Sequence, residues 1–206
     1  MASTASPAVA SGKPTQTRAL EEVLEDLRTH VRERVAAAFD GEEDIIQSGV
    51  DYLSDEAPED TLRFYAEQFT REELKIHEAQ QATWTEETDC DRLDKAFAEL
   101  EESGIVARQN FTCCQTCGNA EIDDELNAAK EKGRTPHGYT FYHMQDTENA
   151  VNGSGLYLAY TGRTGGAEVA KEIIAALERH GLKPEWDGSV ETRIFLPMDW
   201  KRRRKE

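Results

Sequence analysis

Three of the chain's four cysteines fall within residues 113–117, which read CCQTC. Thiolates this close together can share one metal ion or exchange one disulfide bond, and few other reasons favour crowding them. Cys114-x-x-Cys117 followed by Gly118 has the form of a zinc knuckle, because glycine permits the tight backbone turn that such a motif needs. The sequence therefore indicates metal or thiol chemistry in this segment.

A closed structural zinc site needs four ligands, and the chain has no second C-x-x-C. His143, His137 and the distant Cys90 are the candidates to complete it. We favour His143, because it ends a strand expected to run parallel to the strand before the cysteines, which would place the two strand ends side by side. Adjacent Cys113 and Cys114 can face one ion only if the backbone bends sharply, since successive side chains of an extended chain point to opposite sides. The predicted zinc ligands are Cys113, Cys114, Cys117 and His143.

Thiol–disulfide exchange is an alternative use of the same cysteines, with Cys114 or Cys117 attacking and the other resolving the mixed disulfide. A cysteine just before a helix feels the positive end of the helix dipole, which favours the thiolate. The expected start of the following helix at Asn119, after both cysteines, argues against a thioredoxin-like layout. Two further alternatives are a carrier of a soft metal such as copper and an interaction protein whose cysteines are inert packing residues.

Asp146 and Glu148 follow the same expected strand as His143, within the sequence QDTE at 145–148. Either carboxylate could act as a general base or a metal ligand beside the cysteines. The alternative is that Asp146 or Thr147 caps a short helix and that Glu148 lies in its first turn.

The first half of the chain, residues 18–87, is expected to be helical. Apolar residues recur at helical spacing and form one stripe from Leu20 to Ala38. Gly41 and Pro58 mark breaks, and Thr70 followed by Glu73 resembles a capping box that would begin another short helix.

The second part, residues 88–200, mixes helices and strands. From Ile105 onward the expected order is strand, helix, strand, strand, helix and strand, with a hairpin turn at Asp187-Gly188. This order is typical of the split βαβ arrangement of ferredoxin-like folds. The sequence therefore predicts an α+β protein with an N-terminal helical part, a ferredoxin-like βαββαβ domain and a C-terminal hairpin.

Composition restricts the partners. The net charge is −17, so general nucleic-acid binding is disfavoured, and an unknown protein or small molecule is the expected partner. The basic residues 201–206 form a tail that we interpret as solvated, with contact to an acidic partner or nucleic acid as the alternative. Residues 1–17 read as a disordered leader and not as a signal peptide. With no apolar run long enough to span a membrane, we expect a cytoplasmic protein with reduced thiols.

The sequences FTCCQTCG at 111–118 and QDTE at 145–148 resemble those of a bacterial family of uncharacterised proteins, known as a domain of unknown function. The likeness covers the second half of the chain well and the helical half loosely. It implies no activity, and enzymatic function is left open, with a non-enzymatic role favoured. The sequence thus predicts a zinc-binding or regulatory module, with the redox enzyme and the inert interaction protein as alternatives.

Overall fold

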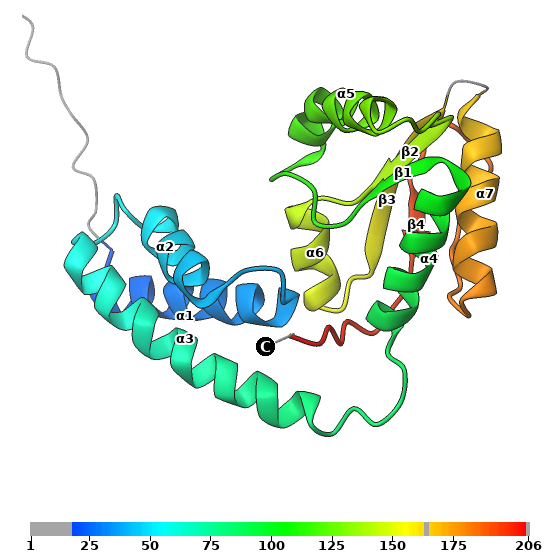
Figure 1. The fold of residues 1–206 in the computed structure, drawn as a ribbon. Helices are drawn as coiled ribbons and strands as arrows, with labels where there is room; N and C mark the ends of the chain where they lie inside the picture. The colour runs from blue at the N-terminus through cyan, green and yellow to red at the C-terminus, as the bar shows by residue number, and fades with distance from the viewer. Residues whose placement is uncertain (1–17, 163–164, 205–206) are drawn as a thin grey trace, which may run out of the picture.

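The structure, a computed structural model, describes residues 18–162 and 165–204, and it has a helical part and a sheet-containing part joined by one linker (Figure 1). The predicted leader, residues 1–17, lies outside the described residues. The helical part consists of α1 (Leu20–Ala37), α2 (Glu42–Tyr52) and α3 (Glu59–Gln81). Their apolar stripes meet in a core whose buried residues include Val23, Leu27, Val31, Ile45, Val50, Leu62 and Ala66.

Helix α3 is one continuous helix, so the prediction of a separate helix beginning at Thr70 was wrong. No glycine or proline interrupts residues 59–81, and Thr70 is itself buried within the helix. The apolar spacing on both sides of Thr70 therefore belongs to a single stripe.

The sheet-containing part alternates helices and short strands. Its elements are α4 (Asp89–Ser103), β1 (Ile105–Arg108), α5 (Gln115–Glu131), β2 (Gly138–Phe141), α6 (Met144–Val151), β3 (Leu156–Gly162), α7 (Gly166–Arg179) and β4 (Ile194–Leu196). The mixed helix and strand content confirms the α+β class. None of the described helices is both long and apolar enough to cross a bilayer.

The four strands lie in the order β1-β2-β3-β4. Strands β1 and β2 are parallel, with Arg108 beside Phe141, and α5 is the crossover between them. The other two pairs are antiparallel. The predicted split arrangement is wrong, because a split βαβ unit places another strand between its parallel pair. Here β4 occupies the edge of β3 where β1 would otherwise lie.

The predicted C-terminal hairpin is reduced to one antiparallel bridge between Glu185 and Phe195. Strand β4 instead pairs along its whole length with β3, from Leu156–Leu196 to Leu158–Ile194. Its buried side chains thereby join the main core, which offsets the loss of a regular hairpin.

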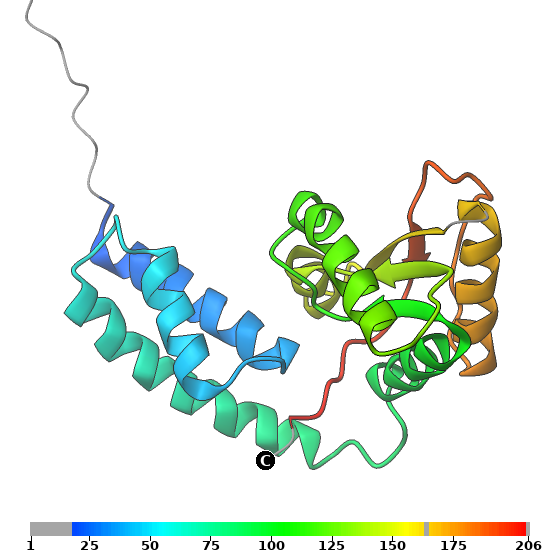
Figure 2. The same ribbon diagram turned by 45° about the horizontal axis from the view of Figure 1, so that its top comes forward.

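Helices cover the two faces of the sheet (Figures 1 and 2). Because side chains alternate along a strand, Ile105 and Ala107 face the core formed with α4 and α7, whereas Val106 faces a smaller core under α5. The smaller core includes Ile122 and Phe141. Helix α5 therefore rests on the sheet through few apolar contacts.

The C-terminal segment returns between the two parts (Figure 1). The Trp200 indole donates to the Ala36 carbonyl at 3.0 Å, and Arg204 donates to the Val35 carbonyl at 3.1 Å, both at the end of α1. Arg202 bonds Asp94 of α4 at 2.9 Å. The interpretation of a solvated tail was therefore wrong for these arginines, which bind the unpaired carbonyls of a helix end and acidic side chains.

Candidate metal centre

The cysteines lie where the chain leaves β1 and enters α5. This loop is held by backbone hydrogen bonds to the neighbouring end of β2: the Phe111 amide donates to the Tyr142 carbonyl at 2.8 Å. Likewise, the Met144 amide donates to the Thr112 carbonyl at 3.1 Å. The parallel pairing expected from the sequence thus brings the cysteine loop beside the segment that begins α6.

Two residues in this loop, Asn110 (φ 51°) and Thr112 (φ 58°), adopt the left-handed conformation. Asparagine tolerates it, but for a β-branched threonine it is an outlier that costs of order 1–3 kcal/mol. The Thr112 hydroxyl donates to the Cys114 carbonyl at 3.2 Å, which helps to hold the bend. This bend directly precedes Cys113 and supplies the sharp change of direction that adjacent cysteines need to face one point.

The three sulfur atoms lie within 4.8 Å of one another, and those of Cys113 and Cys117 are 3.3 Å apart. A tetrahedral zinc ion with Zn–S bonds of about 2.3 Å would place its sulfurs about 3.8 Å apart. Cys113 is exposed, while Cys114 and Cys117 are half-buried. The arrangement leaves the cluster open to ions and other solutes.

Cys114 is the N-cap of α5, which begins at Gln115 and not at Asn119 as the sequence suggested. The Cys117 amide, and to a smaller extent the neighbouring thiols, lower the pKa of Cys114. Hydrogen bonding and repulsion from Cys113 and Cys114 raise the pKa of Cys117. Cys114 therefore loses its proton more readily than Cys117, and a bound cation would favour deprotonation of the sulfurs that bind it.

Gly118 allows the first turn of α5 to lie against the sheet. A Cβ atom at this position would come within 2.5 Å of the Phe141 ring. Since Phe141 belongs to β2, the absence of a side chain at Gly118 fixes how closely the cysteine-bearing turn approaches the strand. The glycine of the zinc-knuckle pattern thus has a packing role.

His143 lies at the start of α6, close in the chain to the segment that contacts the loop, but its ring has other partners. Its Nδ1 accepts a hydrogen bond from the Asp146 amide at 3.3 Å, and its Nε2 lies 3.0 Å from the Asp146 carboxylate. Arg193 also donates to this carboxylate at 3.0 Å. The ring is buried, and burial lowers the pKa of His143 and favours its neutral form. His143 is not in the group of three sulfurs.

The other predicted residues also lie outside that group. Asp146 is the N3 residue of the capping box of α6, whose N-cap is His143, so the alternative in which Asp146 or Thr147 caps this helix was wrong about the capping residue. Glu148 faces α1, where burial and Glu33 raise the pKa of its carboxyl. His137 contacts Glu172 at 2.9 Å, and Cys90 is buried in α4, where burial raises its pKa to about 12.

The sequence did not point to Arg193 or to the conformation of Thr112. Arg193 lies next to an apolar strand and has no neighbouring motif, so only the folded chain links it to Asp146. For Asn110, the known tolerance of asparagine for the left-handed conformation was an available signal.

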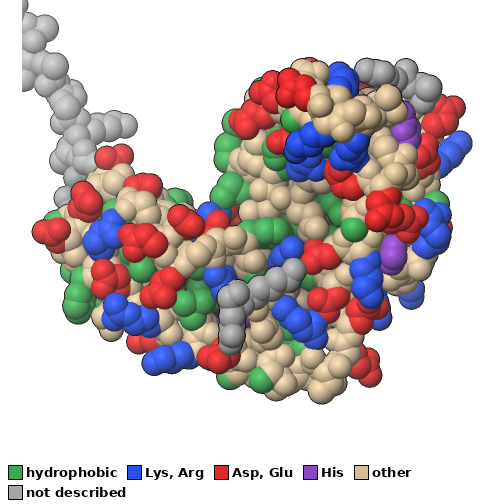
Figure 3. Space-filling view, in the orientation of Figure 1, with side chains coloured by type: hydrophobic (Ala, Val, Ile, Leu, Met, Phe, Trp, Pro, Cys, Tyr) green, Lys and Arg blue, Asp and Glu red, His purple; other side chains and the backbone are tan. Residues whose placement is uncertain are grey.

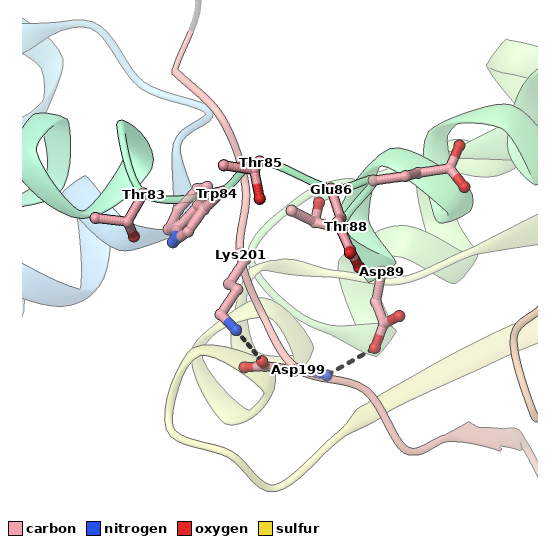
Figure 4. A pocket seen from close by; sticks show the side chains of 9 residues that line it. Thr83, Trp84, Thr85, Glu86, Thr88, Asp89, Asp199 and Lys201 are labelled. Atoms are coloured by element: carbon pink, nitrogen blue, oxygen red, sulfur yellow. Dashed lines mark hydrogen bonds and ion pairs between the residues drawn. The ribbon is translucent and has the colours of Figure 1, made fainter.

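The space-filling view shows the molecule hollowed between its two parts (Figure 3). At the junction, one cavity of about 540 Å³ is lined by residues that include Phe39, Asp94 and Arg202. A second cavity, of about 410 Å³, lies between the linker and the C-terminal segment, where Asp199 accepts from Lys201 and donates its amide to Asp89 (Figure 4). Neither is lined by the clustered cysteines.

Fold and site together define an α+β protein with an exposed three-cysteine cluster at the N-terminus of a crossover helix. The chain belongs to the family described as a domain of unknown function, DUF6891, whose model matches residues 20–204. Comparison with curated proteins and with solved structures gave no match. The resemblance to a family of unknown function is confirmed, whereas its bacterial origin and its particular motifs stay predictions.

Proposed function

We propose that this chain is a metal-binding protein in which the thiolates of Cys113, Cys114 and Cys117 bind one zinc ion. The observation that carries the proposal is the convergence of three sulfur atoms within 4.8 Å at the surface. A chain in which cysteines only pack would bury them, as it buries Cys90. Cysteines that stay exposed or half-buried and converge on one point are better explained by a shared ligand.

Three thiolates and an open fourth position describe the proposed site. Zinc is four-coordinate, and sites with three protein ligands leave one position for water or another molecule. The predicted fourth ligand, His143, would have to give up its contacts with Asp146 and Arg193 and leave a buried position. We therefore propose that the fourth ligand is water or a donor atom of a small molecule or partner protein.

Zinc is the proposed metal because three thiolates suit it and a tetrahedral S–S spacing of about 3.8 Å fits the cluster. Copper(I) also prefers thiolates, so a soft-metal carrier uses the same residues. Loading the metal-free protein with zinc and with copper(I) in turn distinguishes a zinc site from a copper carrier.

The experiment is elemental analysis of protein purified without added metal, followed by zinc competition with a chromophoric chelator. We expect about one zinc per chain, and we expect Cys117→Ser to reduce the affinity at least about tenfold because a charged ligand is lost. Cys90→Ser is the matched control, since Cys90 is a buried cysteine outside the cluster. A wild-type chain that binds neither zinc nor copper(I) would contradict the proposal.

Thiol–disulfide exchange is the second candidate, and the lowered pKa of Cys114 at the helix N-terminus favours it. In this reaction the Cys114 thiolate attacks a disulfide of the substrate and releases one substrate thiolate. Cys117 then loses its proton, attacks Cys114 and releases the second substrate thiol, so that two electrons pass to the substrate. With a thiol such as reduced glutathione to regenerate the Cys114–Cys117 dithiol, catalysed reduction of a small disulfide that Cys114→Ser abolishes would favour this function over metal binding.

A further inference from the structure

The start of α6 contacts the same loop that presents the cysteines. The Thr147 hydroxyl donates to Asn110 Oδ1 at 2.7 Å, and the Met144 amide holds the Thr112 carbonyl at 3.1 Å. Asn110 and Thr112 are the two left-handed residues of the loop. The two hydrogen bonds therefore stabilise the two loop residues whose left-handed backbone conformation is unfavourable by itself.

The α6 segment is itself fixed from two sides. Asp146 accepts hydrogen bonds from the His143 amide at 3.2 Å and from Arg193 at 3.0 Å. Thr147 and Asp146 are both 1% exposed, so neither side chain has an evident role in contacting a solute directly. Their hydrogen bonds instead connect the segment before β4 to the loop before α5.

We propose that Thr147 is a positioning residue for the cysteine cluster: with Asp146 and Arg193 it holds the Asn110–Thr112 bend that turns Cys113 toward Cys114 and Cys117. This inference rests on the proposed metal site. It links the FTCCQTCG segment, which presents the cysteines, to the QDTE segment, which holds their loop in place. Residues that orient metal ligands without touching the metal commonly contribute about 10- to 100-fold to affinity.

The test compares Thr147→Val with Thr140→Val, measuring zinc affinity by chelator competition and melting of the metal-free protein. Thr140 is the matched control, because it is also a buried threonine whose hydroxyl donates a hydrogen bond, here to the Ala159 carbonyl at 3.0 Å within the sheet. We expect Thr147→Val to weaken zinc binding at least about tenfold. We expect Thr140→Val to change it by about twofold or less, even if both variants melt at lower temperature.

A second pair of variants keeps the test decisive if Thr147→Val does not fold. Asn110→Ala removes the hydrogen-bond acceptor and disfavours the left-handed conformation, whereas Asn110→Gly removes the acceptor but adopts that conformation freely. We therefore expect Asn110→Gly to bind zinc more weakly than the wild type, because it lacks the acceptor for Thr147, and Asn110→Ala to bind zinc more weakly still. Wild-type zinc affinity in Asn110→Gly, or equal losses for the two threonine variants, would overturn the positioning role.

A metal-free measurement separates this inference from the proposed function. The equilibrium between the Cys113–Cys117 dithiol and its disulfide, in a glutathione buffer, reports how closely the loop holds the two sulfurs. The disulfide forms as two thiols lose two protons and two electrons to oxidised glutathione. If the wild type binds no zinc, the proposed function fails, but a disulfide equilibrium shifted severalfold by Thr147→Val and not by Thr140→Val would still support positioning. An unshifted equilibrium would overturn it.

Discussion

The indole N–H of Trp200 donates a hydrogen bond to the carbonyl oxygen of Ala36, 3.0 Å away, and so joins the C-terminal segment to the end of α1. Four residues later, the Arg204 guanidinium donates to the carbonyls of Val35 and Asp40. Burial lowers the pKa of Arg204, and the negative charge of Asp40 partly opposes this shift. The helical part is thus attached to the sheet-containing part by Trp200 and by Arg204 of the predicted basic tail.

We expect Arg204→Gln to lower the free energy of unfolding by about 1–3 kcal/mol, because the carbonyls of Val35 and Asp40 lose their donor in a partly buried place. Urea unfolding measures this change. Lys201→Gln is the control, since Lys201 is exposed and forms an ion pair with the exposed Asp199, and it should change stability by no more than about 0.5 kcal/mol. Equal effects of the two substitutions would mean that the segment does not join the two parts.

We expect Gly118→Ala to lower the free energy of unfolding by about 1–3 kcal/mol, because its Cβ would overlap the Phe141 ring and push the first turn of α5 away from β2. Zinc affinity should fall as well, since Cys114 and Cys117 belong to that turn. Gly166→Ala is the comparison: its Cβ would make only ordinary contacts of 3.5 Å or more. A Gly118→Ala protein as stable as Gly166→Ala would contradict the packing role of the glycine.

His30 makes stability depend on pH. Burial, with a smaller effect of Arg34, lowers the pKa of His30 from 6.5 to about 4, and its ring bonds Ser48 at 2.8 Å and stacks on Tyr52. Between pH 6.5 and about 4, His30 is protonated in the unfolded chain and neutral in the folded chain. The free energy of unfolding therefore falls as the pH falls through this range. Each pKa unit corresponds to about 1.4 kcal/mol. Because His30 is partly exposed, solvent screening reduces the expected loss of unfolding free energy to about 2 kcal/mol.

The measurement is urea unfolding at pH 7 and pH 5 for the wild type and His30→Gln. Glutamine keeps a hydrogen-bonding group for Ser48 but does not titrate, so the variant should lose less stability between the two pH values. The same loss in both proteins would show that other groups, such as the buried His143, dominate this range.

The periodic features of the chain were predictable from sequence. The stripe of Val23, Leu27 and Val31 forms a helical core, and the parallel pairing of β1 with β2 places the cysteine loop beside the start of α6. Both follow from local spacing and from the geometry of a strand-helix-strand unit. The clustering of three cysteines in five residues also identified the candidate site directly.

The remaining features depend on contacts between distant residues. The strand order follows from β4 pairing with the edge of β3, and the two carbonyls that the Arg204 guanidinium contacts lie more than 160 positions away. The ring of His143 is occupied by Asp146 and Arg193, a contact spanning 50 positions for the arginine. The left-handed conformation of Thr112 runs against the preference of threonine, so local propensity predicts the opposite.

X-ray absorption at the zinc edge, on the zinc-loaded wild-type protein, tests the central claim most directly because it counts the sulfur and lighter ligands. The proposed site predicts three sulfur atoms at about 2.3 Å and one oxygen or nitrogen at about 2.0 Å, without the scattering pattern of imidazole. An imidazole pattern would contradict the open fourth position and support His143 as ligand. Fewer than three sulfur neighbours would contradict zinc binding by the three cysteines.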